Sequence, residues 1–351
     1  MLKFIGRRLG YGLLVMMGVT VIVFFLFHLL PGDPARMVAG KRSDITTIEA
    51  INKEFGLDKP LPVQFYLYLK DLSPISIHED TPQNQDKYEY TELINLGEEV
   101  LVLKAPYLRR SFQTNKRVGE LLMENLEPTI WLALAAMAFA TIFGIAIGVV
   151  SAVNQHKFLD NFLVAGSVLG ISLPSFVAAI IISMIFGYYL ADWTGLGLTG
   201  QLYDYSPFGG KTLNLKNLVL PAFTLGIRPL AIIMQLTRSS MLDVLKQDYI
   251  RTAYSKGLPY KKVLVKHALK NALNPVITAV SGWLASLMAG AFFVELVFDW
   301  KGFGYVTIKA VESLDFPVVM GAVLIIALIF VFVNILVDAL YALIDPRVRI
   351  S

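Results

Sequence analysis

Few side chains in this sequence are suited to catalysis or to metal binding. There is no cysteine, which excludes disulfides, thiolate metal sites and a cysteine nucleophile. The four histidines, at positions 28, 78, 156 and 267, are too far apart to indicate a metal site. No His-Glu-x-x-His motif, intramembrane aspartate pair or serine–histidine constellation supports a protease or a lipid transferase. We therefore expect no catalytic residues in this chain and no cofactor or metal bound by it.

One short segment partly matches a nucleotide-binding motif. Gly210-Lys211-Thr212 matches the end of a phosphate-binding loop. In that motif a glycine stands five positions before the Gly-Lys pair, and the loop follows a strand. Here the required position is Tyr205, and no strand is expected before it. Because no ATP site of its own is predicted, any ATP-driven activity of this chain would depend on a partner protein.

The most distinctive pattern lies between residues 247 and 275. It contains Arg251, Thr252, Ala253 and Lys256, a turn at Gly257-Leu258-Pro259, and a basic run that ends in Asn271-Ala272-Leu273-Asn274-Pro275. Ala253 and Gly257 are four positions apart, so a helix would place both on one face. Small residues there would let a partner helix or the wall of a groove approach closely, and glycine can adopt a positive φ that ends a helix. The pattern predicts a helix–turn–helix that contacts another protein, although membrane topology alone could explain its basic residues.

The positioning elements are predicted to be membrane helices. Hydrophobic residues make up 55% of the 351 residues and charged residues only 17%, whereas soluble domains average about 25% charged residues. The basic residues form no aromatic-laced patch, so nothing indicates nucleic-acid binding. A helix needs about 20 apolar residues to cross a bilayer core of about 30 Å. Six stretches qualify, namely 9–30, 129–153, 162–191, 218–237, 276–294 and 318–337. The fold class predicted is an all-α polytopic membrane protein with six transmembrane helices.

The distribution of lysine and arginine predicts the orientation of these spans. The N-terminal tail carries three such residues and the 238–272 loop carries eight, but the loops at 192–217 and 295–317 carry two each. Short cytoplasmic loops are the basic ones. We therefore expect both termini and the 238–274 loop in the cytoplasm. The chain would then comprise a tail and first helix (1–30), an extracytoplasmic segment (31–128) and a five-helix core (129–351).

Several motifs, in order along the chain, together resemble the B-type permease subunits of dipeptide and oligopeptide ABC importers. They are Leu30-Pro31-Gly32-Asp33-Pro34, Phe55-Gly56-Leu57-Asp58-Lys59-Pro60-Leu61, Gly170-Ile171-Ser172-Leu173-Pro174-Ser175-Phe176, Leu220-Pro221-Ala222-Phe223-Thr224-Leu225-Gly226, Thr237-Arg238-Ser239-Ser240-Met241 and Asp345-Pro346-Arg347. The 247–275 segment resembles the family's "EAA" loop, which carries a coupling helix that docks on an ATPase subunit. Two positions depart from the general signature, since its glutamate is Arg251 here and its first alanine is Thr252.

The resemblance implies a fold of the ABC type I importer permease kind in a bacterial inner membrane. It further implies a C-type permease partner, two ATPase subunits that bind ATP and magnesium, and an extracytoplasmic substrate-binding protein. The expected function is to form half of an inward pathway for short peptides. Nickel, glutathione or another small solute are the alternatives within the same class. A stand-alone secondary transporter is less favoured, because such folds usually contain internal repeats and none is apparent here.

The extracytoplasmic segment combines several local signals. Thr46-x-x-Glu49 is typical of a capping box that starts a helix. Residues 74–92 are polar and are expected to form a loop, 100–103 a strand and 118–126 a helix. Residues 74–108 look like an insertion relative to the family. The segment would serve as a cap on the helices, as a docking surface for a binding protein, or as both.

A few polar residues interrupt the predicted spans. Arg228 lies near the middle of the fourth span, where a charge costs about 2.5–3.5 kcal/mol on insertion scales. It should form a structural ion pair, for which Glu295 and Asp192 are candidates, bind a carbonyl group beside Pro229, or line the pore. Pro174, flanked by Ser172 and Ser175, should kink the third span, either to open a cavity or only for packing. Asn334, near the cytoplasmic end of the last span, would seal an inner gate or cap the helix.

Overall fold

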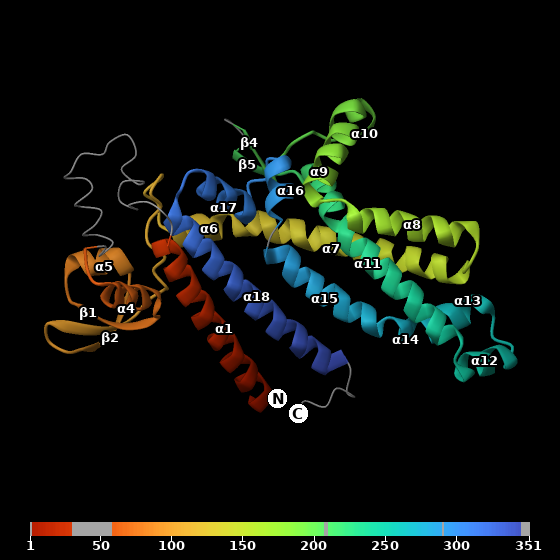
Figure 1. Cartoon of the computed structure of the whole chain (residues 1–351), viewed down its shortest axis with the longest axis horizontal. Helices are drawn as coiled ribbons and strands as arrows, with labels where there is room; N and C mark the ends of the chain where they lie inside the picture. Colours follow the sequence, from red (N-terminus) through yellow and green to blue (C-terminus); the bar gives the residue numbers. More distant parts are fainter. Residues whose placement is uncertain (1, 30–57, 207–209, 290, 345–351) are drawn as a thin grey trace. The chain divides into compact units, whose positions relative to one another are not determined.

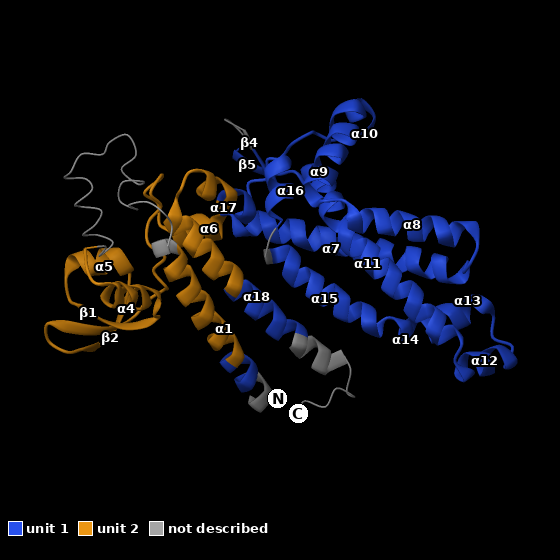
Figure 2. Cartoon of the chain, viewed as in Figure 1, with its two compact units in different colours: residues 1–10, 125–306, 328–351 blue, residues 11–124, 307–327 orange. Residues whose placement is uncertain are grey.

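The computed structural model describes residues 2–29, 58–206, 210–289 and 291–344. The predicted capping box at 46–49 and the motifs at 30–34, 55–57 and 345–347 lie outside these residues. The chain divides into two compact units, which are coloured separately in Figure 2. The helical unit comprises residues 1–10, 125–306 and 328–351, and the sheet-bearing unit comprises 11–124 and 307–327.

Long helices dominate the structure (Figure 1). The helices of the first half are α1 (Leu2–Leu29), α4 (Leu61–Leu72), α5 (Pro82–Tyr88), α6 (Val118–Glu124), α7 (Leu126–Val153), α8 (Phe158–Ser172), α9 (Ser175–Met184) and α10 (Ala191–Thr194). Those of the second half are α11 (Val219–Leu245), α12 (Asp248–Ser255), α13 (Tyr260–Lys262), α14 (Lys270–Ala272), α15 (Asn274–Ala289), α16 (Phe292–Val297), α17 (Phe303–Glu312) and α18 (Phe316–Ile344). Short π-helical segments at Ile185–Tyr189 and Val263–Leu269 and a 3-10 turn at Leu215–Leu218 complete the helical elements.

Within the described parts of the chain, four helical stretches are long and apolar enough to cross a membrane. They are Gly6–Leu26, Val118–Val153, Leu215–Leu245 and Phe316–Val337, and they correspond to the first, second, fourth and sixth predicted spans. A fifth would be α8 with α9, if that bent pair is counted as one span. The fold class is therefore a mainly helical, multi-pass membrane protein.

The third predicted span is not a single helix. The axes of the helices on either side of residues 173 and 174 are bent by 109°. Leu173 is extended, with φ −73° and ψ 127°, because the ring of Pro174 disfavours a helical residue before it. Pro174 also has no amide hydrogen to continue the helical bonding. The predicted break at Pro174 is thus present, and it divides the stretch predicted over 162–191 into two helices.

The fifth predicted span is also divided. α15 has 16 residues, about 24 Å at 1.5 Å per residue, which is shorter than a bilayer core of about 30 Å. It ends at Ala289, and the separate helix α16 begins at Phe292. One continuous helix was predicted over 276–294, but two separate helices, α15 and α16, lie on either side of residue 290.

Glycines allow α7 and α11 to pack at very short distance in the helical unit. A Cβ atom added to Gly144 would lie 2.9 Å from Cγ2 of Ile233. One added to Gly148 would lie 2.6 Å from Cβ of Thr237 and 2.7 Å from the carbonyl oxygen of Met234. Small residues four apart are a common means of close helix approach in membranes. The resulting α7–α11 pair forms the centre of the unit's hydrophobic core.

The sheet-bearing unit contains a three-stranded antiparallel sheet in the order β1–β3–β2. The strands are β1 (Ile75–Glu79), β2 (Thr91–Asn95) and β3 (Glu99–Leu103). The predicted strand at 100–103 and the predicted helix at 118–126 are confirmed by β3 and α6. The prediction of a loop over 74–92 is wrong, because β1, α5 and the start of β2 lie there. In the helical unit, an unpredicted hairpin is formed by β4 (Tyr203–Ser206) and β5 (Gly210–Leu213).

The inner face of the three-stranded sheet covers a buried polar cluster. His78 on β1 is 4% exposed, and its Nε2 lies 2.9 Å from the Ser76 hydroxyl. The ring of Tyr88 packs against the imidazole with a centroid separation of 4.3 Å. Lys104, which is also buried, donates through Nζ to the backbone oxygen of Asp71. Burial, followed by the charges of three nearby lysines, lowers the pKa of His78 from 6.5 to about 4.

This pKa shift predicts acid sensitivity of the sheet-bearing unit. Since the unfolded chain binds a proton at position 78 more readily than the folded chain, stability should fall as the pH drops from about 6.5 towards 4. At pH 5 the loss from this group would be up to about 2 kcal/mol relative to pH 7. The measurement is thermal unfolding of the wild type and His78→Gln at both pH values. An equal loss in both proteins would contradict the prediction.

Candidate coupling site

The segment that follows α11 forms the predicted helix and turn. α12 begins after the extended residue Gln247 and ends at Ser255. Gly257 then adopts φ +74°, a left-handed conformation that favours glycine. Pro259 leads into α13, and the π-helical segment and α14 continue from it to Ala272. The local sequence signals therefore predicted both the helix and the residue at which the chain turns.

One face of α12 packs on the chain itself. Ile250 and Ala253 are 1% and 8% exposed, respectively. They belong to a buried cluster, here called the coupling cluster, which also contains Ala152, Met241, Val263, Ala268 and Ala272. Of the two neighbours expected for Ala253, a partner helix or the wall of a groove, the structure shows helices of the same chain. Its small side chain lets α12 lie close to the ends of α7 and α11.

The opposite face of α12 is open to a partner. Arg251, Thr252, Ser255 and Lys256 are exposed. The Arg251 side chain is 81% exposed, and its guanidinium lies 3.9 Å from the carboxylate of Asp248, a separation at which an exposed pair contributes little. A Cβ atom added to Gly257 would meet no atom within 4 Å. Leu258 packs partly against the coupling cluster, and Pro259 is exposed.

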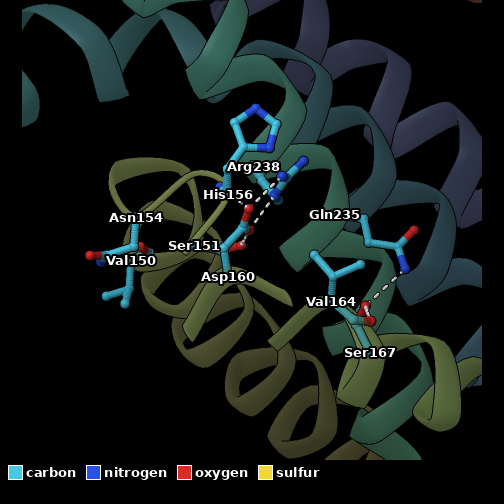
Figure 3. Close-up of polar contacts among 9 residues, drawn as sticks. All are labelled: Val150, Ser151, Asn154, His156, Asp160, Val164, Ser167, Gln235 and Arg238. Carbon is cyan, nitrogen blue, oxygen red and sulfur yellow. Dashed lines mark hydrogen bonds and ion pairs between the residues drawn. The ribbon is translucent and has the colours of Figure 1, made fainter. Parts of the chain in front are cut away.

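A buried carboxylate lies where α7, α8 and α11 meet, as Figure 3 shows. Asp160, in the first turn of α8, is 1% exposed. Its Oδ1 accepts hydrogen bonds from Nε of Arg238 at 2.7 Å and from the Ser151 hydroxyl at 2.5 Å. Its Oδ2 accepts from NH2 of Arg238 at 2.7 Å and from the backbone N–H of His156 at 3.0 Å. The carboxylate therefore joins the end of α7, the start of α8 and α11.

From the sequence, Arg238 was recognisable only as part of a family motif and as a basic residue of the 238–272 loop, and Asp160 was not predicted. A single aspartate at the edge of an apolar stretch is most simply read as a polar residue at a helix start. Its partner is 78 positions away, so no local spacing rule connects them. The available signal was weak: an arginine at the end of one predicted span and an aspartate before another, both expected on the cytoplasmic side.

Arg228 does not form the ion pair that was considered for it. Glu295 is fully buried, and it accepts hydrogen bonds from the Thr129 hydroxyl at 2.6 Å and from the Tyr305 backbone N–H at 2.8 Å. Arg228 is exposed, and no described residue forms a hydrogen bond or an ion pair with its guanidinium. Every residue from 220 to 238 is described, and Arg228 alone among them is exposed. The guanidinium of Arg228 therefore lies on a face of α11 that no described residue of this chain covers.

The other polar candidates are three residues at one bend, Ser172, Pro174 and Ser175, and the distant Asn334. Ser172, Pro174 and Ser175 are exposed at the bend between α8 and α9, and the Ser172 hydroxyl donates to the Val168 carbonyl at 2.8 Å. Asn334 is half-buried and donates to the carbonyl of Phe330 on its own helix at 2.7 Å. The hydrogen bonds of Ser172 and Asn334 are thus made within their own helices and join them to no shared site.

Two family models match this chain and together cover most of its length. The family model described as "Binding-protein-dependent transport system inner membrane component" matches residues 144–350, and the model for the N-terminal part of such membrane components matches residues 1–133. A solved structure described as an amino acid ABC transporter matches with a TM-score of 0.44 and 14% identity, over 66% of this chain and 95% of that chain.

Three relatives are similar along nearly their whole length. A di/tripeptide transport system permease protein of Pseudomonas aeruginosa is 36% identical, over 99% of both chains. A dipeptide transport system permease protein of Alkalihalophilus pseudofirmus is 35% identical, over 99% of this chain and 100% of the relative. A glutathione transport system permease protein of Pectobacterium atrosepticum is 35% identical, over 99% and 98%. This chain therefore belongs to the family of binding-protein-dependent transport system inner membrane components, the multi-pass permease subunits of ABC importers.

Proposed function

We propose that this chain forms half of an inward pathway for dipeptides or oligopeptides. The names of two similar relatives refer to peptide transport and that of a third to glutathione, itself a small peptide-like solute. These names support a short peptide as substrate, with glutathione as the second candidate. A C-type permease would supply the other half of the pathway, and an extracytoplasmic binding protein would deliver the substrate.

The single observation that supports ATP-driven coupling is the two-sided character of α12. Its inner face is held by the coupling cluster, and its outer face presents Arg251, Thr252 and Lys256 to solvent. A short helix anchored on one side and free on the other suits docking on a cytoplasmic ATPase. Two such ATPase subunits would bind ATP and magnesium and supply the energy. In this arrangement both termini and α12 lie in the cytoplasm.

The proposed orientation of the chain in the membrane can be tested by labelling introduced cysteines. The absence of cysteine means that single introduced cysteines can be labelled selectively. Gln85→Cys should react with an impermeant reagent from outside, and Lys261→Cys only from the cytoplasmic side. Labelling of both positions from the same side would contradict the proposed topology.

The coupling role predicts the effect of reversing the charge of Arg251. Arg251→Glu should leave thermal stability unchanged, because the side chain is exposed, while it weakens docking of the ATPase. Lys216→Glu makes the same change of net charge on the expected outer side and is the matched control. The measurement is peptide uptake and binding-protein-stimulated ATP hydrolysis by the reconstituted complex. Unchanged stimulation in Arg251→Glu would remove the exposed face of α12 from the mechanism.

Two further variants separate turn geometry from docking. Gly257→Val forces a β-branched residue into a positive φ, which costs on the order of 1–3 kcal/mol, so it should alter coupling through the turn. Ala253→Glu would place a carboxylate in the coupling cluster and should reduce stability first.

The substrate itself is tested by uptake of labelled dipeptides, tripeptides and glutathione into vesicles that hold the complex. Uptake of none of them would reject the proposed substrate class.

A further inference from the structure

The Asp160–Arg238 pair has the geometry of a rigid link. Two parallel hydrogen bonds of 2.7 Å fix both the distance and the relative orientation of the carboxylate and the guanidinium. The remaining two hydrogen bonds to Asp160 come from Ser151 and from the backbone of His156. His156 presents its N–H with φ +65°, a conformation that few residues other than glycine adopt. The carboxylate thus holds three segments in one arrangement.

The same helix ends also hold the coupling helix. Ala152, next to Ser151, and Met241, three residues after Arg238, are both members of the coupling cluster. Ile250 and Ala253 of α12 pack in that cluster. The ends of α7 and α11 therefore contact α12 through apolar packing. They contact α8 through the carboxylate of Asp160, α7 by the Ser151 hydrogen bond and α11 by the ion pair with Arg238.

α8 is positioned to pass a displacement onward. It packs along α11, where Gly170 lies against Ile227 and Ser167 accepts a hydrogen bond from Gln235 at 2.9 Å (Figure 3). At its other end the chain bends by 109° into α9. A shift of the first turn of α8 would therefore reach the bend at Pro174.

Stability alone does not account for a buried ion pair at this place. The Asp160 side chain is 1% exposed, and that of Arg238 is 24% exposed. Desolvation of the carboxylate, and in part of the guanidinium, offsets much of their attraction, and apolar replacements of similar volume are often neutral or stabilising. We propose that Asp160 and Arg238 are positioning residues that transmit movement of α12 through α11 to α8. The proposal rests on the proposed function, since it requires that α12 moves with an ATPase subunit.

The test uses a paired apolar replacement. Asp160→Leu combined with Arg238→Met removes the link without leaving an unpaired buried charge. In the reconstituted complex, peptide uptake per ATP hydrolysed should fall by about ten-fold, within the range of coupling free energies between sites, while thermal stability stays near that of the wild type. Arg238→Lys keeps the charge but loses the paired hydrogen bonds, so it should be intermediate. Lys309→Met combined with Glu312→Leu, which removes an exposed ion pair within α17, is the matched control and should stay near the wild type.

A second measurement is independent of the substrate. Spin labels on Ser255→Cys and Phe162→Cys, both at exposed positions, report the distance between α12 and α8 in the complex. With the link present, the distance distribution should be narrow and equal with and without ATP. In the paired replacement it should broaden or change with ATP. A narrow, unchanged distribution or unchanged uptake per ATP in that variant would overturn the proposal. Failure of the wild type to take up peptides would instead reject only the proposed substrate.

Discussion

Gly148→Ala should destabilise the helical unit strongly. The added methyl group would lie 2.6 Å from Cβ of Thr237 and 2.7 Å from the backbone oxygen of Met234. Neither contact is the flexible end of a side chain, so α7 and α11 would have to separate. Overpacking of this kind typically costs about 1–3 kcal/mol and occasionally more, and here it would also loosen the contacts on both sides of Gly148.

Gly166→Ala is the matched control for this prediction. Gly166 is also inside a helix, α8, but a Cβ atom there would meet no atom within 4 Å. Alanine is favoured over glycine in a helix by up to about 1 kcal/mol, so this variant should be neutral or slightly more stable. Both proteins would be purified and their thermal unfolding compared. Equal melting temperatures would show that the close approach of α7 and α11 does not limit stability.

Arg228→Gln should alter transport while stability is retained. The guanidinium is exposed and has no partner among the described residues, so its removal leaves no buried charge behind. A charge at this depth needs water or an opposite charge, and the proposed pathway supplies water and the substrate's terminal carboxylate. A hydrogen bond to a charged group contributes about 1.5–3 kcal/mol, which corresponds to a loss in uptake of roughly ten-fold to a hundred-fold.

The comparison of two substrates makes the role of Arg228 specific. Uptake of a peptide with a free C-terminal carboxylate should fall in Arg228→Gln, and uptake of its amidated form should change little. Arg228→Lys keeps a positive charge and should retain most of the preference for the free acid. Thermal stability of the complex is measured in parallel. A large loss of stability with an unchanged preference would instead mean that Arg228 pairs with a neighbouring subunit.

The features that the sequence predicted correctly depend on local physics. Apolar runs of sufficient length indicated the helices that became α1, α7, α11 and α18, because burial in a bilayer requires about 20 such residues whatever their neighbours. The break at Pro174 and the turn at Gly257 follow from the backbone chemistry of those two residues. The ordered motifs also indicated the family to which the chain belongs.

The strands of the sheet-bearing unit were harder to predict from the sequence. β1 and β2 lie in a polar stretch, and every residue of β2 is exposed, so neither has the apolar run by which strands are usually recognised. Their pairing with β3 satisfies the backbone groups that a loop would leave to water. The signal for a sheet was therefore present in β3 alone, and its partners depended on the tertiary fold.

By itself the sequence determined the class of membrane protein, the helices of its longest apolar runs and the positions of the turn and the break. Only the tertiary structure decided which faces meet. It turned Ala253 towards the chain's own coupling cluster, left Arg228 uncovered, and joined Asp160 to Arg238 across 78 positions. The physical reason is that helical periodicity places residues on a common face but does not specify the neighbour of that face. That neighbour depends on which helices pack together, and here close approach at Gly144 and Gly148 sets the packing of α7 on α11.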